Sequence, residues 1–128
     1  QFSAQLSAQL AERPPLADAQ AFVLEHPEAD LSVPALARRA GMSPRNFARV
    51  FTREVGTTPA RFVEAARIEA ARRRLEEGAQ GVEEVAAACG FGSAETLRRA
   101  FLRAVRVSPA AYRSRFRTAS DEARGGEA

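Results

Sequence analysis

The segment VPALARRAGMSPRNFARVF (residues 33–51) is repeated further along the chain as VEEVAAACGFGSAETLRRAF (residues 82–101). The first half of each copy aligns at a constant separation of 49 residues, which pairs Val33, Leu36, Ala37 and Gly41 with Val82, Val85, Ala86 and Gly90. The second copy then gains one residue, so the later matches are 50 apart and pair Phe51, Pro59 and Phe62 with Phe101, Pro109 and Tyr112. Two copies that keep their register predict a duplicated structural unit.

Each copy predicts two short helices joined by a turn that contains glycine. Apolar residues recur at helical spacing on both sides of Gly41 and Gly90, and the residue after a helix often needs the positive φ that glycine adopts freely. Ser43 is expected to cap the second helix of the first copy, with Pro44 at its first position. Two helices at a steep angle across such a turn form a helix-turn-helix motif, and two motifs in tandem are a strong signal.

The whole sequence predicts an all-α fold of about seven helices, with two helix-turn-helix subdomains joined by a long linker helix. The expected helices begin at Leu16 and then cover residues 33–40, 44–55, 59–77, 82–89, 93–105 and 109–116. The predicted division is an interdomain linker over residues 1–15, a first subdomain over 16–58, the linker helix over 59–78, a second subdomain over 79–117 and a disordered tail over 118–128.

Three finer expectations concern single segments. Adjacent prolines favour extended backbone, so Pro14-Pro15 is expected to be extended at the end of the linker. The spacing of apolar residues predicts one buried face on the long helix, formed by Ala65, Ile68, Ala71 and Leu75. The run Arg72-Arg73-Arg74, followed by Glu76-Glu77, is expected to be a solvated face of the same helix.

The composition excludes several classes of protein. Of the 128 residues, 45% are hydrophobic and 27% charged, which is typical of a soluble globular protein, and no apolar run approaches the ~18 residues of a membrane helix. One cysteine and one histidine exclude an internal disulfide and a four-ligand zinc site. Cys89 is expected to be a small buried residue, and His26 to have a packing role at a helix end. With no catalytic constellation in the sequence, we expect a cytoplasmic protein that is not an enzyme and takes no cofactor.

The charge is unevenly distributed along the chain. All 19 basic residues are arginines. Residues 38–117 contain 17 arginines and 8 acidic residues, a net charge of +9, whereas residues 1–37 have a net charge of −4 and residues 118–128 of −2. A basic body with acidic ends predicts a polyanionic partner.

The second helix of each motif predicts how that partner is bound. On a helical wheel, Arg45 and Arg49 lie opposite the buried residues Phe47, Val50 and Phe51. Glu95 and Arg99 occupy the same two positions opposite Leu97, Ala100 and Phe101, with Arg98 and Arg103 beside them. Arginine pairs bidentately with guanine, and a carboxylate accepts a hydrogen bond from cytosine N4, so both faces have the chemistry needed to contact base edges.

The long helix over residues 59–77 spans roughly 27 Å at ~1.5 Å per residue. Two recognition helices (44–55 and 93–105) joined by such a helix are expected to enter successive major-groove segments of promoter DNA, one turn (~34–36 Å) apart. Bending of the DNA and flexing of the helix are both compatible with the sequence.

The motifs resemble the AraC/XylS family of bacterial transcription regulators over roughly residues 16–117. The second unit has the closest match, at Gly90-Phe91, Ser93, Leu97, Phe101, Ser108-Pro109 and Tyr112-Arg113. QFSAQL, SPRNFARVF and CGFGSAETLRRAF are most similar to the GlxA-type subgroup. Its members join this module to an N-terminal domain resembling PfpI and class I glutamine amidotransferases, so the resemblance implies that the chain is a C-terminal piece. Arg106 departs from the glycine that the family often has there.

The resemblance implies base contacts from Arg45, Ala48 and Arg49 in the first motif. In the second motif it implies contacts from Ala94, Glu95, Thr96, Arg98 and Arg99. We expect the base contacts to be Arg45, Arg49, Glu95, Thr96, Arg98 and Arg99. The expected contacts to the DNA backbone are the helix-start residues and flanking polar residues Ser43, Asn46, Arg53, Thr57, Ser93, Arg103 and Ser108.

The expected partner is therefore double-stranded DNA, with RNA polymerase as a further partner. The chain itself is expected to be monomeric and the intact protein to dimerise through the N-terminal domain. The alternative is a helical protein-interaction module that docks to the transcription machinery without reading sequence. A membrane-surface element is disfavoured, because the apolar residues have matched core partners in the repeat.

Overall fold

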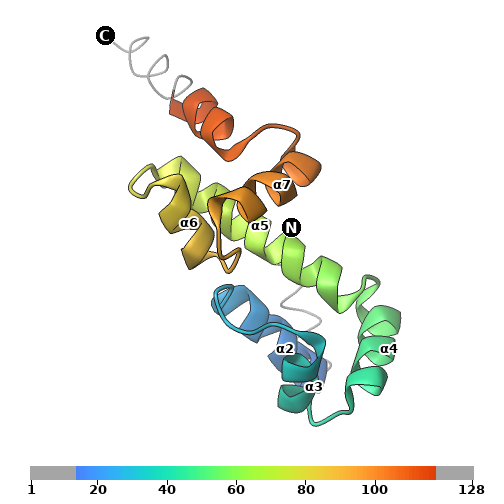
Figure 1. The fold of residues 1–128 in the computed structure, drawn as a ribbon. Coiled ribbons are helices and arrows are strands. Elements are labelled where there is room, and N and C mark those ends of the chain that lie inside the picture. The colour runs from blue at the N-terminus through green and yellow to red at the C-terminus, as the bar shows by residue number, and fades with distance from the viewer. Residues whose placement is uncertain (1–13, 118–128) are drawn as a thin grey trace. The chain divides into compact units, whose positions relative to one another are not determined.

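The structure is a computed structural model, and it describes residues 14–117 (Figure 1). Those residues form helices α2 (Pro14–Glu25), α3 (Val33–Ala40), α4 (Pro44–Val55), α5 (Pro59–Glu77), α6 (Val82–Ala88) and α7 (Ala94–Val105), followed by a helical segment over 109–117. No strand occurs within them. The prediction of an all-α fold with about seven helices is confirmed. Most of the predicted linker and the predicted tail lie outside the described residues.

The start of α2 corrects one expectation. Pro14 and Pro15 are not extended, because they form the beginning of α2. The first N–H groups of a helix have no intrahelical acceptor, so proline sacrifices no hydrogen bond there, and its fixed φ already suits the helix. Adjacent prolines at this point are therefore a helix start.

The helices of the first motif begin and end where the sequence predicts. The Ser32 hydroxyl accepts a hydrogen bond from the backbone N–H of Ala35 (3.3 Å), and the Ser43 hydroxyl accepts one from Asn46 (3.2 Å). Gly41 ends α3 at a φ of 71°. These caps satisfy backbone groups that the helix itself leaves unpaired, and they fix the first residue of α4.

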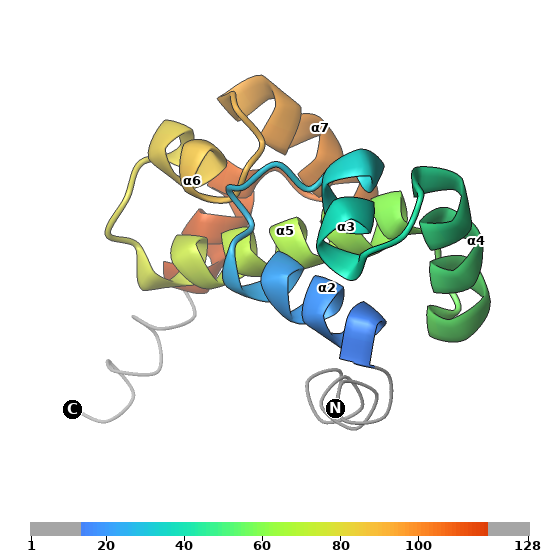
Figure 2. The ribbon, with the colours of Figure 1, turned by 90° about the horizontal axis from the view of Figure 1, so that it is seen from below.

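The described residues divide into two compact units, with the boundary in α5 between Ala66 and Arg67. In the first unit, α3 packs against both α2 and α4 (Figure 2). Its core holds the fully buried Phe47 and Phe51, whose ring centroids are 5.5 Å apart, and Phe62, whose ring meets that of Phe51 edge-on. The inner face of α4 is therefore fixed by aromatic packing.

The second unit has a core of its own, formed by α6, α7, the second half of α5 and the segment 109–117. Val85, Leu97 and Phe101 are fully buried, and the Tyr112 ring packs edge-on against Phe101 at 5.4 Å. Cys89 is also fully buried, as predicted, and burial raises the pKa of its thiol. The inner face of α7 thus corresponds to that of α4.

Helix α5 contributes to both cores, and this corrects the prediction of a single apolar face. Phe62, Val63 and Ala66 are buried in the first core, and Ile68, Ala71 and Leu75 in the second. Ala65, expected to be on the buried face, is exposed. The spacing of apolar residues predicts one continuous stripe only for a helix that packs against one core, whereas each half of α5 buries its own set of residues in a different core.

The turn after α7 contains a strained residue. Arg106 has a φ of 73° and is the one non-glycine residue with positive φ in the part of the chain that the structure describes. Its counterpart after α4 is Gly56, with a φ of 91°. The departure from glycine noted in the sequence therefore falls on a backbone position that favours glycine.

Within residues 14–117, no helix has the length and apolar content required to cross a membrane.

Candidate nucleic-acid interface

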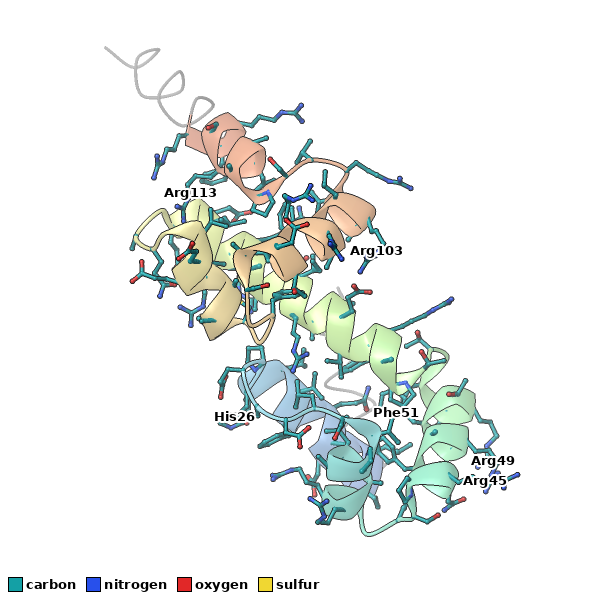
Figure 3. The ribbon with its side chains drawn as sticks, viewed as in Figure 1. His26, Arg45, Arg49, Phe51, Arg103 and Arg113 are labelled. Carbon is teal, nitrogen blue, oxygen red and sulfur yellow. The ribbon has the colours of Figure 1, made fainter. Side chains whose placement is uncertain are left out.

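Helix α4 presents an exposed face of arginines. Arg45, Arg49 and Arg53 are exposed, while Phe47 and Phe51 are buried on the opposite side. In Figure 3, Arg45 and Arg49 lie together on the outer side of α4 and point away from Phe51. The structure therefore brings together the two predicted contact residues of this helix.

The arginines of α4 differ in their partners. Arg49 Nη2 donates a hydrogen bond to Asn46 Oδ1 (2.5 Å), and the backbone N–H of Asn46 is itself bound by the Ser43 cap. Arg53 Nε pairs with Glu54 Oε2 at 3.3 Å and stays 60% exposed. The first turn of α4 contains no acidic residue. The positive charge of this face is thus neutralised only near the end of the helix.

Helix α7 has the same layout with a different charge pattern. Glu95 lies in its first turn and accepts hydrogen bonds from Arg98 Nε (2.9 Å) and Arg98 Nη2 (2.7 Å). It also accepts one from Arg99 Nε (3.0 Å). These hydrogen bonds lower the pKa of the Glu95 carboxyl from 4.5 to about 2, with the bond to Arg98 as the largest cause. The three predicted contacts Glu95, Arg98 and Arg99 form one cluster.

The predicted helix-start residues are mostly capping residues. The hydroxyls of Ser43, Ser93 and Ser108 each accept a hydrogen bond from the backbone N–H three residues later. A hydroxyl can both accept and donate, so the hydroxyl protons of Ser43 and Ser108 are not used by these caps, whereas the Ser93 hydroxyl also shares a hydrogen bond with that of Thr96. Thr57 differs from the predicted pattern, because it is half-buried and does not cap a helix. The cap of α5 is Thr58, whose hydroxyl accepts a hydrogen bond from the backbone N–H of Arg61 (3.2 Å). The Thr58-Pro59 pair matches Ser43-Pro44 and is the signal that identifies it.

Thr96 and Arg103 complete the predicted set on α7. Both are exposed. The Thr96 hydroxyl lies 3.0 Å from the Ser93 hydroxyl, so the two share a hydrogen bond at the start of the helix. Figure 3 shows Arg103 near the other end of α7. The side chains of Thr96 and Arg103 thus lie at opposite ends of this helix.

The run Arg72–Arg74 is not the uniform solvated face that the sequence predicted. The Arg72 guanidinium lies 5.6 Å from the centroid of the Tyr112 ring and hydrogen-bonds its hydroxyl, which raises the pKa of Arg72. Arg74 Nη1 donates to Gln80 Oε1 (2.8 Å). Only Arg73 of the three is exposed. Two of these arginines therefore join α5 to its neighbours within the second unit.

Two other side chains have packing roles. The His26 ring lies 4.8 Å from that of Phe22, and its Nδ1 is 3.7 Å from Glu28. This confirms the predicted packing role of His26, at the end of α2. In the second unit, Arg113 Nε donates to the Leu75 carbonyl (3.3 Å) and so ties the segment 109–117 to α5 (Figure 3).

The chain is similar in sequence to known transcriptional regulators. A family model described as a helix-turn-helix domain matches residues 36–115. The HTH-type transcriptional regulator Rv1931c of Mycobacterium tuberculosis is 59% identical over 81 residues, which cover 63% of this chain and 31% of the relative. The HTH-type transcriptional regulator GlxA of Rhizobium meliloti is 35% identical over 97 residues, covering 73% and 30%. The chain therefore spans about a third of the length of these relatives.

A solved structure is similar over most of the chain. It is the crystal structure of the DNA-binding domain of AdpA, described as a global transcriptional factor, in complex with a target DNA. The TM-score is 0.78 at 42% sequence identity, over 81% of this chain and 94% of the other.

Proposed function

We propose that this chain, which belongs to the AraC-type helix-turn-helix family of transcriptional regulators, is a sequence-specific DNA-binding domain. The observation that carries the proposal is the exposed arginine face of α4, held outward by a capped helix start and by buried Phe47 and Phe51. A second helix with the same layout, α7, supports it. The AdpA domain, similar in fold and sequence, was solved on its target DNA.

The proposed base contacts are Arg45 and Arg49 from α4, and Thr96, Arg98 and Arg99 from α7, where Glu95 belongs to the same exposed cluster. Arginine offers guanine two parallel N–H donors, for O6 and N7, and each such pair contributes roughly 1–3 kcal/mol of discrimination. Both helices are 12 residues long, so a few turns of each can reach base edges from the major groove.

The proposed phosphate contacts surround these helices. They are Ser43, Asn46 and Arg53 at α4, Thr57 before α5, Ser93 and Arg103 at α7, and Ser108 before the last helical segment. Helix starts offer backbone N–H groups and a favourable dipole to a phosphate, while arginines supply charge. Such contacts fix position and register and do not distinguish sequences.

Two recognition helices in one chain give a single domain the reach of a dimer of single-motif proteins. We propose that they enter successive major-groove segments of promoter DNA. Recruitment of RNA polymerase and dimerisation of the intact regulator belong to the same proposal. It includes no chemical step, in keeping with a family of regulators.

The test is binding of the 128-residue chain to duplexes selected from a random library, compared with scrambled duplexes, over ~50–200 mM salt. We expect a steep loss of affinity with salt and a preference of ~10³-fold or more for the selected site. A steep salt dependence with equal affinity for all duplexes would contradict sequence reading. Absence of binding at low salt would favour the protein-docking alternative.

A further inference from the structure

Glu95 is bound on both of its carboxylate oxygens. Oε1 accepts from Arg98 Nε, and Oε2 accepts from Arg98 Nη2 and Arg99 Nε. Arg98 is therefore held in a bidentate pair, the geometry that fits a guanidinium to a carboxylate best. The two oxygens have about four lone-pair sites, so three bonds leave Glu95 little capacity to accept from a cytosine.

The hydrogen bonds to Glu95 leave a defined edge of each arginine free. A guanidinium has five N–H donors in a fixed planar fork. Arg98 uses the side edge, Nε and Nη2, and retains Nη1 and the second proton of Nη2. Arg99 uses only Nε. The outer edge formed by the two Nη groups suffices for the O6 and N7 of guanine, so pairing with Glu95 and reading of guanine are compatible.

The cluster is accessible from solvent. The side chains of Glu95, Arg98 and Arg99 are 51%, 49% and 69% exposed. A long arginine side chain normally loses rotamer freedom when it binds, and a side chain already held in one orientation loses less. The carboxylate also offsets one of the two positive charges, which weakens the attraction of α7 to phosphates of any sequence.

These observations concern discrimination more than affinity. From them we infer that Glu95 is a positioning residue for the proposed DNA-binding function: it sets the sequence preference of α7 by holding the outer edges of Arg98 and Arg99 ready for guanine. It acts on DNA through the arginines. Removal of the Glu95 carboxylate therefore increases the affinity of α7 for DNA of any sequence and lowers its selectivity.

The first experiment tests the cluster without DNA. The Nε–H signals of Arg98 and Arg99 in ¹⁵N NMR spectra are expected to exchange slowly with water in the unmodified chain and fast in Glu95→Gln. A matched control is Glu69→Gln, which removes the same charge from another helical pair, the one that Glu69 forms with Arg72 (3.6 Å). Equal exchange rates in Glu95→Gln and the unmodified chain would overturn the inference.

The second experiment measures selectivity, as the ratio of affinities for a library-selected duplex and its scrambled counterpart. We expect Glu95→Gln to bind the scrambled duplex more tightly and to lower the ratio by about three- to tenfold. Glu69→Gln should leave the ratio unchanged. A Glu95→Gln ratio equal to that of the unmodified chain would mean that the carboxylate only reduces charge, and would overturn the inference.

The same substitution in an Arg98→Ala/Arg99→Ala chain separates positioning from direct base contact. If Glu95 acts through the two arginines, Glu95→Gln no longer changes the ratio in that background. A ratio that still falls would show that Glu95 contacts a base itself, and would overturn the inference. The proposed function has a separate readout, because it fails only if the unmodified chain shows no preference at all.

Discussion

The two helix-turn-helix units share the order of their helices and the layout of their cores, and they differ on the faces that they expose. In α4, Arg45 and Arg49 have no carboxylate in the first turn, and Arg49 is oriented by the neutral side chain of Asn46. In α7, Glu95 binds both Arg98 and Arg99. Duplication has thus kept the buried positions and varied the exposed ones, as expected if the core serves folding and the surface serves recognition.

One fold thus presents arginines in two different settings. A guanidinium beside a neutral amide keeps its full charge for phosphate or guanine, while one beside a carboxylate gains order and loses part of its long-range attraction. We therefore expect α4 to dominate affinity and α7 to contribute mainly selectivity.

The largest effects are expected from the two cores. Phe51→Ala and Phe101→Ala each remove a fully buried ring and should destabilise their own unit by about 3–5 kcal/mol. Hydrogen exchange followed residue by residue should show lost protection in α3 and α4 for the first variant, and in α6 and α7 for the second. Simultaneous loss of protection in both units would show that they unfold together.

The next effect is expected on the surface of α4. Arg49→Ala should weaken binding to a selected duplex by about 1–3 kcal/mol and relax the preference at one base pair. Arg53→Ala, on the same helix, should weaken binding to all duplexes alike and reduce the salt dependence. Both are measured by fluorescence anisotropy on a panel of single-base variants. A uniform loss with Arg49→Ala would remove it from the base-reading set.

Substitutions in the turns after α4 and α7 are expected to change the free energy of unfolding by smaller amounts and in opposite directions. Arg106→Gly should stabilise the chain by about 1 kcal/mol, because arginine is strained at a φ of 73°. Gly56→Arg should destabilise it by a similar amount, since Gly56 has a φ of 91° and open space beside it. Urea denaturation measures both. A destabilised Arg106→Gly chain would show that the arginine side chain makes a compensating contact.

The smallest effect is expected from the titration of Glu95. Its pKa is lowered to about 2 in the folded chain, so its pairing stabilises the fold above its ordinary pKa of 4.5 and is lost as the pH falls through about 2. The carboxyl signal in NMR spectra should titrate near that value. In Arg98→Ala/Arg99→Ala it should return toward 4.5, and an unchanged titration would assign the shift to another cause.

The sequence predicted most of the fold and the composition of both faces, and the misses have physical causes. The buried phenylalanines mark the inner face of each helix, and helical spacing then places Arg45, Arg49 and Arg99 on the outer face. It did not indicate that Glu95 is bound to both arginines, since pairing at i+3 and i+4 depends on rotamers. Helical spacing also did not indicate that Arg72 contacts Tyr112 or that Arg74 contacts Gln80, because the partners in each pair meet only when the chain has folded.

The division of α5 between two cores has a consequence for how this domain is inherited. A crossover before Pro59 would detach Phe62, Val63 and Ala66 from the first core, and one after Glu77 would detach Ile68, Ala71 and Leu75 from the second. No loop separates the two sets of residues, because both lie in one uninterrupted helix. Recombination between related genes can therefore exchange a whole unit only by joining two sequences inside a helix. Helices α4 and α7 are therefore expected to be inherited together, and new DNA specificities are expected to arise by substitution on their exposed faces.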